Sequence, residues 1–198
     1  MTIDLSPVQR HPLLVRVTHW MAAVSFAALL VSGIAILLAH PRFYWGEVGV
    51  LGVPSLFDLP LPFVLTGQTG WGRSLHFLAA WAMAITGVIY IVMGARRRHF
   101  RWPLYTPLQR RTYLAVVFIL LPLMIWTGLA MSPAVTSVVP FIVRVLGGHQ
   151  SARAIHFAGA LALASFAIGH IIMVAAAGFV PYVMAMITGN LPSRREAA

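Results

Sequence analysis

Eight histidines carry most of the chemistry that this 198-residue sequence offers, because the chain has no cysteine and only four acidic residues. Four of them lie inside long apolar runs: His19, His76, His156 and His170. A polar side chain deep in a membrane is costly, so its presence indicates function, although a hydrogen bond to a neighbouring helix could explain any single one. The other four lie in connections and flanks, where contact with water or the interface explains them: His11, His40, His99 and His149.

The sequence around these histidines has the composition of a membrane protein. It is 60% hydrophobic and only 9% charged, which is far too apolar for a soluble domain of this length. Four runs reach the roughly 20 residues that a helix needs to cross a bilayer: 13–39, 74–95, 112–131 and 154–177. Because lipid cannot satisfy backbone polar groups, each run is expected to be a helix. We expect an all-α membrane protein, a single domain over residues 1–198, built as a four-transmembrane-helix bundle.

The arginines predict how these helices are oriented. The connection 96–111 carries six arginines and no acid, so the positive-inside rule places it on the cytoplasmic side together with both termini. The connections 40–73 and 132–153 then lie outside. Clustering beside apolar runs also argues against nucleic-acid binding, despite a net charge of +10. Pro122 is expected to bend the third helix, and residues 178–190 are expected to continue the fourth along the interface.

The orientation sorts the four membrane histidines into two pairs. His156 and His170 are 14 residues apart, so they share a helix face within about 40° and lie about 21 Å apart along the axis. The first helix runs outward and the second and fourth run inward. His19 is therefore level with His170 on the cytoplasmic side, and His76 is level with His156 outside. Each imidazole pair suits a haem iron with two axial nitrogen ligands, whereas zinc or copper would need ligands that converge on one point.

Other residues in the spans bear on the haem hypothesis. Three of the histidines have an arginine three residues earlier, namely Arg16, Arg73 and Arg153. At that spacing a guanidinium lies one turn nearer the surface, where it could bind a haem propionate, although snorkelling arginines at helix starts have the same appearance. Each span also has a glycine, which leaves room for a flat macrocycle or for close helix packing: Gly33, Gly87, Gly128 and Gly159. No acidic residue lies in the spans, so a di-iron centre or a proton relay lacks carboxylates.

Five short stretches resemble a known family. They are HPLLVRVTHW (11–20), AHPRFYWG (39–46), LLPLMIWTGLAMSP (120–133), GGHQSARAIHF (147–157) and MITG (186–189). They resemble the bacterial di-haem cytochrome b561 superfamily, most of all the thiosulfate reductase cytochrome b subunit type. The chain is also similar to the cytochrome b subunits of formate dehydrogenase-N and nickel–iron hydrogenase over about residues 10–190. The resemblance implies two haem b groups, ligated by His19, His76, His156 and His170, and a periplasmic molybdopterin-dependent or other redox subunit as partner.

These observations favour an electron-transfer subunit over a stand-alone enzyme. Two haems at two depths would connect a quinone pool in the bacterial inner membrane with a periplasmic oxidoreductase, and the substrate chemistry would belong to that partner. The aromatic and proline-rich segment 39–63 is expected to dock the partner or to lie on lipid headgroups. The alternative is a self-sufficient membrane haem oxidoreductase, such as a superoxide oxidase or quinone reductase. A third class, a transporter with buried histidines, lacks intramembrane carboxylates.

The sequence also offers a candidate quinone site. In the resembled formate dehydrogenase and hydrogenase subunits, quinone exchanges near the inner haem, which the connection 96–111 and the end of the fourth helix would frame here. Polar side chains there that could bind the quinone oxygens or exchange a proton are His99, Tyr105, Thr106, Gln109 and Tyr113. The connection also has a simpler explanation as an orientation signal, and an external site near the docking segment is the other possibility.

Overall fold

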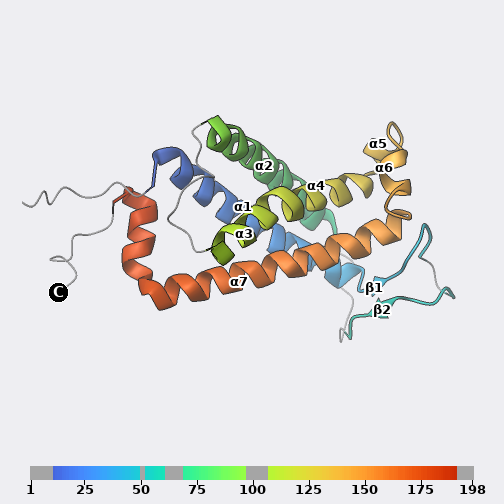
Figure 1. Ribbon diagram of the computed structural model, residues 1–198. Helices are drawn as coiled ribbons and strands as arrows, with labels where there is room; N and C mark the ends of the chain where they lie inside the picture. The colour runs from blue at the N-terminus through green and yellow to red at the C-terminus, as the bar shows by residue number, and fades with distance from the viewer. Residues whose placement is uncertain (1–10, 50–51, 61–68, 97–106, 191–198) are drawn as a thin grey trace, which may run out of the picture.

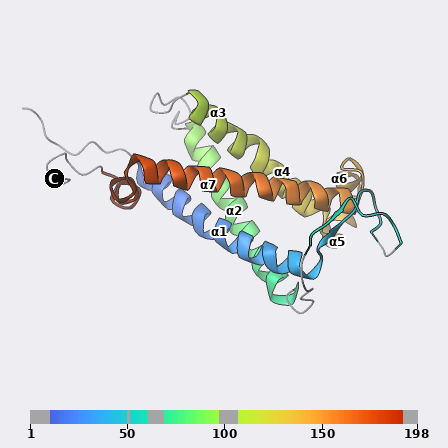
Figure 2. The ribbon, with the colours of Figure 1, turned by 90° about the horizontal axis from the view of Figure 1, so that it is seen from below.

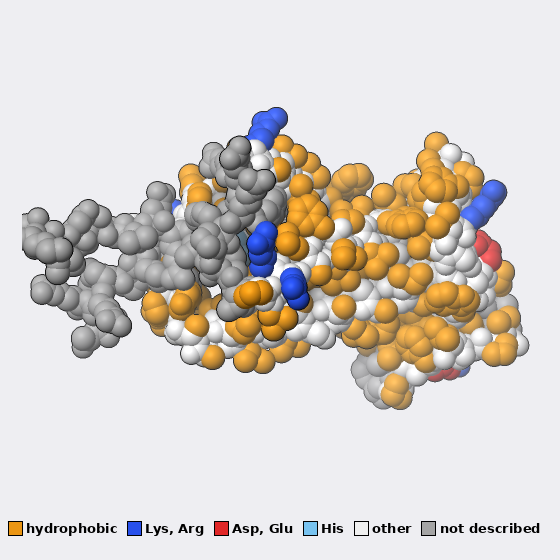
Figure 3. All heavy atoms as spheres, viewed as in Figure 1, with side chains coloured by type: hydrophobic (Ala, Val, Ile, Leu, Met, Phe, Trp, Pro, Cys, Tyr) orange, Lys and Arg blue, Asp and Glu red, His pale blue; other side chains and the backbone are white. Residues whose placement is uncertain are grey.

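Four long helical spans dominate the computed structural model, which describes residues 11–49, 52–60, 69–96 and 107–190 (Figure 1). By length and apolar composition, the segments that can cross a membrane are Leu13–Ala39, Gly70–Arg96, Pro107–Ala130 and His149–Thr188. The predicted all-α, four-helix membrane fold is therefore confirmed. Apolar side chains cover most of the visible face along these spans, as expected for a surface in contact with lipid (Figure 3).

The helices extend further than hydropathy predicts. The first span is α1 (Leu13–Ala39), which has the predicted bounds, and the second is α2 (Thr69–Arg96), which begins before residue 74. The fourth, α7 (His149–Thr188), begins before residue 154, and it continues past residue 177 as expected for residues 178–190. Hydropathy marks only the part of a helix that lies in hydrocarbon, whereas backbone hydrogen bonding carries the helix on into the polar flanks.

The third span is interrupted near the proline that was expected to bend it. It consists of α3 (Pro107–Ala115), the π-helical turn η3 (Val116–Leu120) and α4 (Leu121–Ala130). Pro122 lies in the first turn of α4. Because proline has no N–H and its ring pushes on the carbonyl one turn earlier, a widened turn before it accommodates the residue without ending the helix.

The fourth span ends in a short helical segment that turns sharply away from the long part of α7 (Figures 1 and 2). The turn is at Gly178, whose φ of 117° and ψ of 91° lie outside the helical region, and Pro181 follows it. Glycine tolerates such a positive φ, whereas other residues do not. The C-terminal segment then returns to the start of α1, where the backbone N–H of His11 donates to the carbonyl of Gly189 over 3.3 Å.

The spans associate as two helix pairs, α1 with α2 and α4 with α7, and contacts between the two pairs are sparse. Small residues allow the close approach within each pair. A Cβ on Gly72 would lie 3.1 Å from the Ala35 Cβ, and one on Gly159 would lie 2.7 Å from the Met124 sulfur. Seen from below, α7 runs along the bundle with α1 on one side and α3 and α4 on the other (Figure 2).

Short elements cover one end of the bundle. The strands β1 (Arg42–Phe43) and β2 (Phe57–Asp58) pair antiparallel, and the helices α5 (Pro133–Thr136) and α6 (Phe141–Arg144) connect α4 to α7. The ring of Phe43 packs against those of Phe57 and Phe157, each with a centroid separation of 4.6 Å. This cluster fixes the connection after α1 against the start of α7.

Candidate haem-binding site

The four membrane histidines lie in two pairs, each formed across two helices. The ring centroids of His19 (α1) and His170 (α7) are 6.3 Å apart, with an interplanar angle of 56°. Those of His76 (α2) and His156 (α7) are 6.2 Å apart, at 60°. These are the two pairs that the sequence predicts from the position of each histidine along its span.

The separation within each pair fits an iron atom between the rings. Metal–imidazole bonds of about 2 Å, with each ring centre about 1.1 Å beyond its nitrogen, put two axial imidazole centres about 6.2 Å apart. The interplanar angle is free in such an arrangement, because each ring can rotate about the nitrogen–iron axis. Among the described residues, no three His, Cys, Asp or Glu side chains gather as a group that could hold a metal ion.

A hydroxyl lies beside three of the four imidazoles. The Nδ1 atoms of His76 and His156 are 3.0 Å from the Ser32 Oγ and 2.8 Å from the Thr127 Oγ1. The His170 Nδ1 is 3.3 Å from the hydroxyl of Tyr113. In each case the hydroxyl engages Nδ1, which leaves Nε2 for the facing ring. The fourth imidazole, that of His19, differs from the others because its buried Nδ1 has no hydrogen-bond partner among the described residues.

Two of the glycines noted in the sequence lie against the outer pair. A Cβ on Gly33 would lie 3.7 Å from the His76 Cε1, and one on Gly128 would lie 3.6 Å from the His156 Cε1. At both positions a Cβ would be in ordinary van der Waals contact with the imidazole ring. Gly159 instead serves close packing of α7 on α4, whereas a Cβ on Gly87 would meet no atom within 4 Å. Close helix packing therefore explains Gly159, and room for a macrocycle beside Gly33 and Gly128 stays a prediction.

The three arginines that precede histidines have different surroundings. Arg16 donates from its guanidinium to the carbonyl of Ile187, and its buried Nε has no partner among the described residues. Arg153 donates to the carbonyls of Arg42, over 2.8 Å, and His40, and its guanidinium lies 4.5 Å from the centroid of the Phe43 ring. Arg73 is exposed. Each guanidinium has five N–H donors, so these contacts leave donors for a propionate, and that role stays a prediction.

The structure describes only part of the predicted quinone set. His99, Tyr105 and Thr106 lie outside the described residues. Gln109 and Tyr113 both lie on α3 and are half-buried, and the Tyr113 hydroxyl contacts His170. The sequence placed Tyr113 near the proposed inner haem, but it did not predict this contact with one of the proposed ligands.

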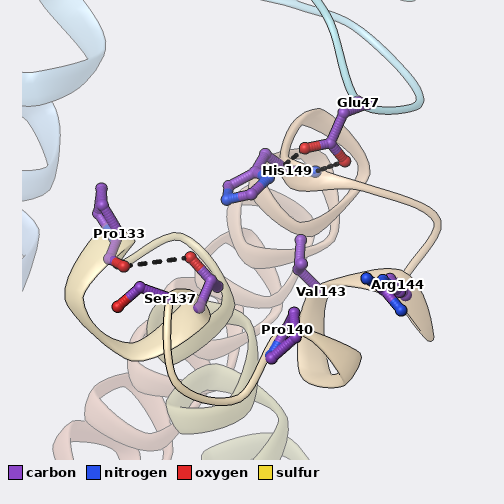
Figure 4. Close-up of a pocket in the computed structure, with 8 residues that line it drawn as sticks. Glu47, Pro133, Ser137, Pro140, Val143, Arg144 and His149 are labelled. Atoms are coloured by element: carbon purple, nitrogen blue, oxygen red, sulfur yellow. Dashed lines mark hydrogen bonds and ion pairs between the residues drawn. The ribbon is translucent and has the colours of Figure 1, made fainter.

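A surface pocket lies at the N-terminal end of α7 (Figure 4). Its volume is about 420 Å³, and its lining comes from the α1–α2 and α4–α7 connections and the start of α7: Glu47, Pro133, Thr136, Ser137, Pro140, Val143, Arg144 and His149. The His149 Nδ1 lies 2.6 Å from a carboxylate oxygen of Glu47, and the other oxygen accepts the His149 backbone N–H over 3.3 Å. His149 is the first residue of α7, the helix that carries His156, and its assignment to an external connection stays a prediction.

Sequence reasoning did not find the hydroxyl partners. Ser32 and Thr127 are serine and threonine in apolar helices, where such residues commonly bond their own backbone. The sequence could nevertheless have indicated these two hydroxyls, because the comparison of depths along antiparallel helices applies to serine and threonine as well as to histidine. Ser32 lies opposite His76, and Thr127 lies opposite His156. Applying this comparison to every polar residue in the spans would have identified both.

Comparisons with known proteins show which family the chain belongs to. The family model described as prokaryotic cytochrome b561 matches residues 10–189. A curated relative from Azospira oryzae, the putative protein-methionine-sulfoxide reductase subunit YedZ1, is 30% identical over 213 aligned positions, which cover 91% of this chain and 96% of the relative. No solved structure matches the chain. The comparisons do not single out the thiosulfate reductase type, so that narrower resemblance stays a prediction. A match over nearly the whole chain, together with four spans and two histidine pairs, identifies this multi-pass membrane protein as a member of the prokaryotic cytochrome b561 family, which binds b-type haem.

Proposed function

We propose that the chain binds two b-type haems and carries electrons between the quinone pool and a periplasmic oxidoreductase. His19 and His170 would ligate the inner haem, and His76 and His156 the outer one. The observation that carries the proposal is the pair of ring separations, 6.3 and 6.2 Å, each suited to one iron. Haem iron supplies a one-electron carrier, and the chain supplies its ligands, its depth in the membrane and its surroundings.

The partner is proposed from the relative and from the outer surface. The Azospira protein is named as a subunit of a protein-methionine-sulfoxide reductase, and we propose that this chain serves a redox subunit of related kind, one that is molybdopterin-dependent. Its docking surface would include the connection between α1 and α2, where Trp45, Leu56 and Phe57 are exposed. The Arg-rich connection after α2 would then face the cytoplasm of a bacterium, with both termini on the same side.

A reduced-minus-oxidised visible spectrum of the purified protein tests haem binding directly. Acid-acetone extraction should then yield about two haems per chain, because no Cys-x-x-Cys-His sequence is present for covalent attachment. Both haems should be six-coordinate and low-spin. One haem per chain, or a high-spin ferric spectrum in the purified protein, contradicts the proposed ligation.

A stand-alone membrane haem oxidoreductase is the second candidate, and the pocket beside His149 favours it. His149 lies seven residues before His156, so it is about 10.5 Å further out along α7 and within about 20° of the same face. A small redox substrate bound there would lie near the outer haem, with the Glu47–His149 pair to exchange its proton. Copurification of the protein from its native membrane distinguishes the two candidates, since only the first requires a stoichiometric redox subunit.

A further inference from the structure

We infer that Ser32 and Thr127 are positioning residues of the outer haem, each of which accepts a hydrogen bond from Nδ1–H of one axial histidine and thereby holds its Nε2 toward the iron. The inference rests on the proposed ligation by His76 and His156. It goes beyond that proposal, because it assigns the tautomer and the orientation of both ligands to two hydroxyls on neighbouring helices.

The direction of these hydrogen bonds follows from where the hydroxyl protons go. The Ser32 Oγ lies 2.6 Å from the carbonyl of Ala28 and 3.2 Å from that of Leu29. A hydroxyl has one proton and a carbonyl has none, so the Ser32 proton is donated to its own helix. The oxygen is then left to accept, and the Nδ1 of His76, 3.0 Å away, must be the donor.

Thr127 repeats this arrangement on the other helix pair. Its Oγ1 lies 2.7 Å from the carbonyl of Leu123 and 3.2 Å from that of Met124, and 2.8 Å from the Nδ1 of His156. The Thr127 proton is likewise donated to its own helix, so the oxygen is left to accept from the Nδ1 of His156.

Burial makes these bonds effective. Ser32 and Thr127 are both 0% exposed, so water does not compete for Nδ1–H. In a neutral imidazole, a proton on Nδ1 leaves the lone pair on Nε2, which is the atom that must bind iron. The acceptor also raises the basicity of the ligand. Stronger donation favours ferric iron, so each bond is expected to lower the potential of the outer haem.

Two pairs of variants test the inference. Thr127→Val and Ser32→Ala remove the acceptor with little change in volume, whereas Thr127→Ser and Ser32→Thr keep it. Ser25→Ala is the matched control, because Ser25 is also a buried α1 hydroxyl and lies two turns from Ser32, about 10.5 Å away from the histidine level. The measurements are a spectroelectrochemical titration and the low-spin ferric EPR spectrum, which reports the relative orientation of the two imidazole planes.

Removing either acceptor should raise the potential of the outer haem. The expected shift corresponds to an equilibrium constant for haem reduction that is about three- to tenfold larger, and a tenfold change is about 59 mV for a one-electron couple. The outer EPR signal should move, and the inner haem should be unchanged. Thr127→Ser, Ser32→Thr and Ser25→Ala should retain wild-type values. If the Thr127→Val protein lacks the outer haem and the Thr127→Ser protein retains it, the hydroxyl at position 127 is required for binding of that haem.

Two outcomes overturn the inference and leave the proposed function intact. One is an outer haem with unchanged potential and EPR spectrum in both Thr127→Val and Ser32→Ala. The other is loss of the outer haem from Thr127→Val and Thr127→Ser alike, which would mean that the methyl group and not the hydroxyl matters. A wild-type protein without haem would instead refute the proposed function itself.

Discussion

Replacing His156 with alanine should remove the outer haem and leave the inner haem in place. His156 is the α7 member of the outer pair, and its ring centroid lies 6.2 Å from that of His76. Without it, His76 remains as a lone imidazole, which cannot hold a six-coordinate low-spin iron. His170 lies on the same helix, but 14 residues further on, so it cannot substitute for the missing ligand.

The distance between the two levels predicts how little the inner haem should change. Fourteen helical residues correspond to about 21 Å along α7. One unit charge at that distance contributes about 0.8 kcal/mol at an effective dielectric constant of about 20. For a one-electron couple this is about 35 mV. The inner haem of the His156→Ala protein should therefore titrate within about 35 mV of its wild-type potential.

The assay combines haem content with a redox titration of the purified variant. We expect half of the wild-type haem per chain and the loss of one spectral component, the same component that His76→Ala removes. His19→Ala and His170→Ala should remove the other. The control is His149→Ala, which alters a histidine two turns away on α7 and should keep both haems. The pairing is refuted if His19→Ala and His76→Ala abolish the same component, or if His156→Ala leaves two low-spin haems.

Three further predictions concern residues around the haems. Neutralising Arg16, Arg73 or Arg153 with glutamine should lower the potential of the nearer haem, because the lost positive charge disfavours the added electron; wild-type potentials in all three variants would leave these residues as structural anchors. Gly178→Ala should destabilise the C-terminal turn by about 1–2 kcal/mol, because an alanine at a φ of 117° is strained, and thermal unfolding in detergent measures this. Tyr113→Phe should slow reduction of the haems by quinol while both remain spectrally intact, and a wild-type rate would remove Tyr113 from the quinone site.

The pairing of the membrane histidines could be predicted because it depends on two sequence patterns. Hydropathy defines the spans, and the arginine distribution defines their direction, so the level of His19, His76, His156 and His170 follows from counting residues. The histidine pairs then required no knowledge of side-chain packing. The starts of α2 and α7 could not be predicted in the same way, because each helix begins in a polar flank that hydropathy does not mark.

The surroundings of the histidines depend on how the helices rotate about their axes, which a single sequence does not define. Ser32 and Gly33 are adjacent in α1, and both face His76, which requires that face of α1 to turn toward α2. The guanidinium contacts of Arg153 depend in turn on the path of the connection after α1. Spacing alone placed Arg153 near His156 but could not predict that its guanidinium binds the backbone of residues 40–42.

The arrangement of contacts suggests why the histidine pairs matter for the fold as well as for electron transfer. At the outer end, Gly46 donates its N–H to the Ser151 Oγ over 2.8 Å, and Arg153 binds the carbonyl of Arg42. At the other end, the indole of Trp20 donates to the carbonyl of Met186 over 3.1 Å. These contacts join the α1/α2 pair to the α4/α7 pair at the two ends of the bundle.

Between those ends, the two helix pairs make sparse contacts, and the histidines of each level come from opposite pairs. His19 and His76 belong to α1 and α2, whereas their partners His170 and His156 both belong to α7. An iron bound by one histidine of each helix pair would cross-link the two halves of the bundle at its level. Since such ligation exists only in the folded protein, haem binding would contribute directly to folding stability. The bundle is therefore expected to be held by protein contacts at its ends and by its two cofactors along its length.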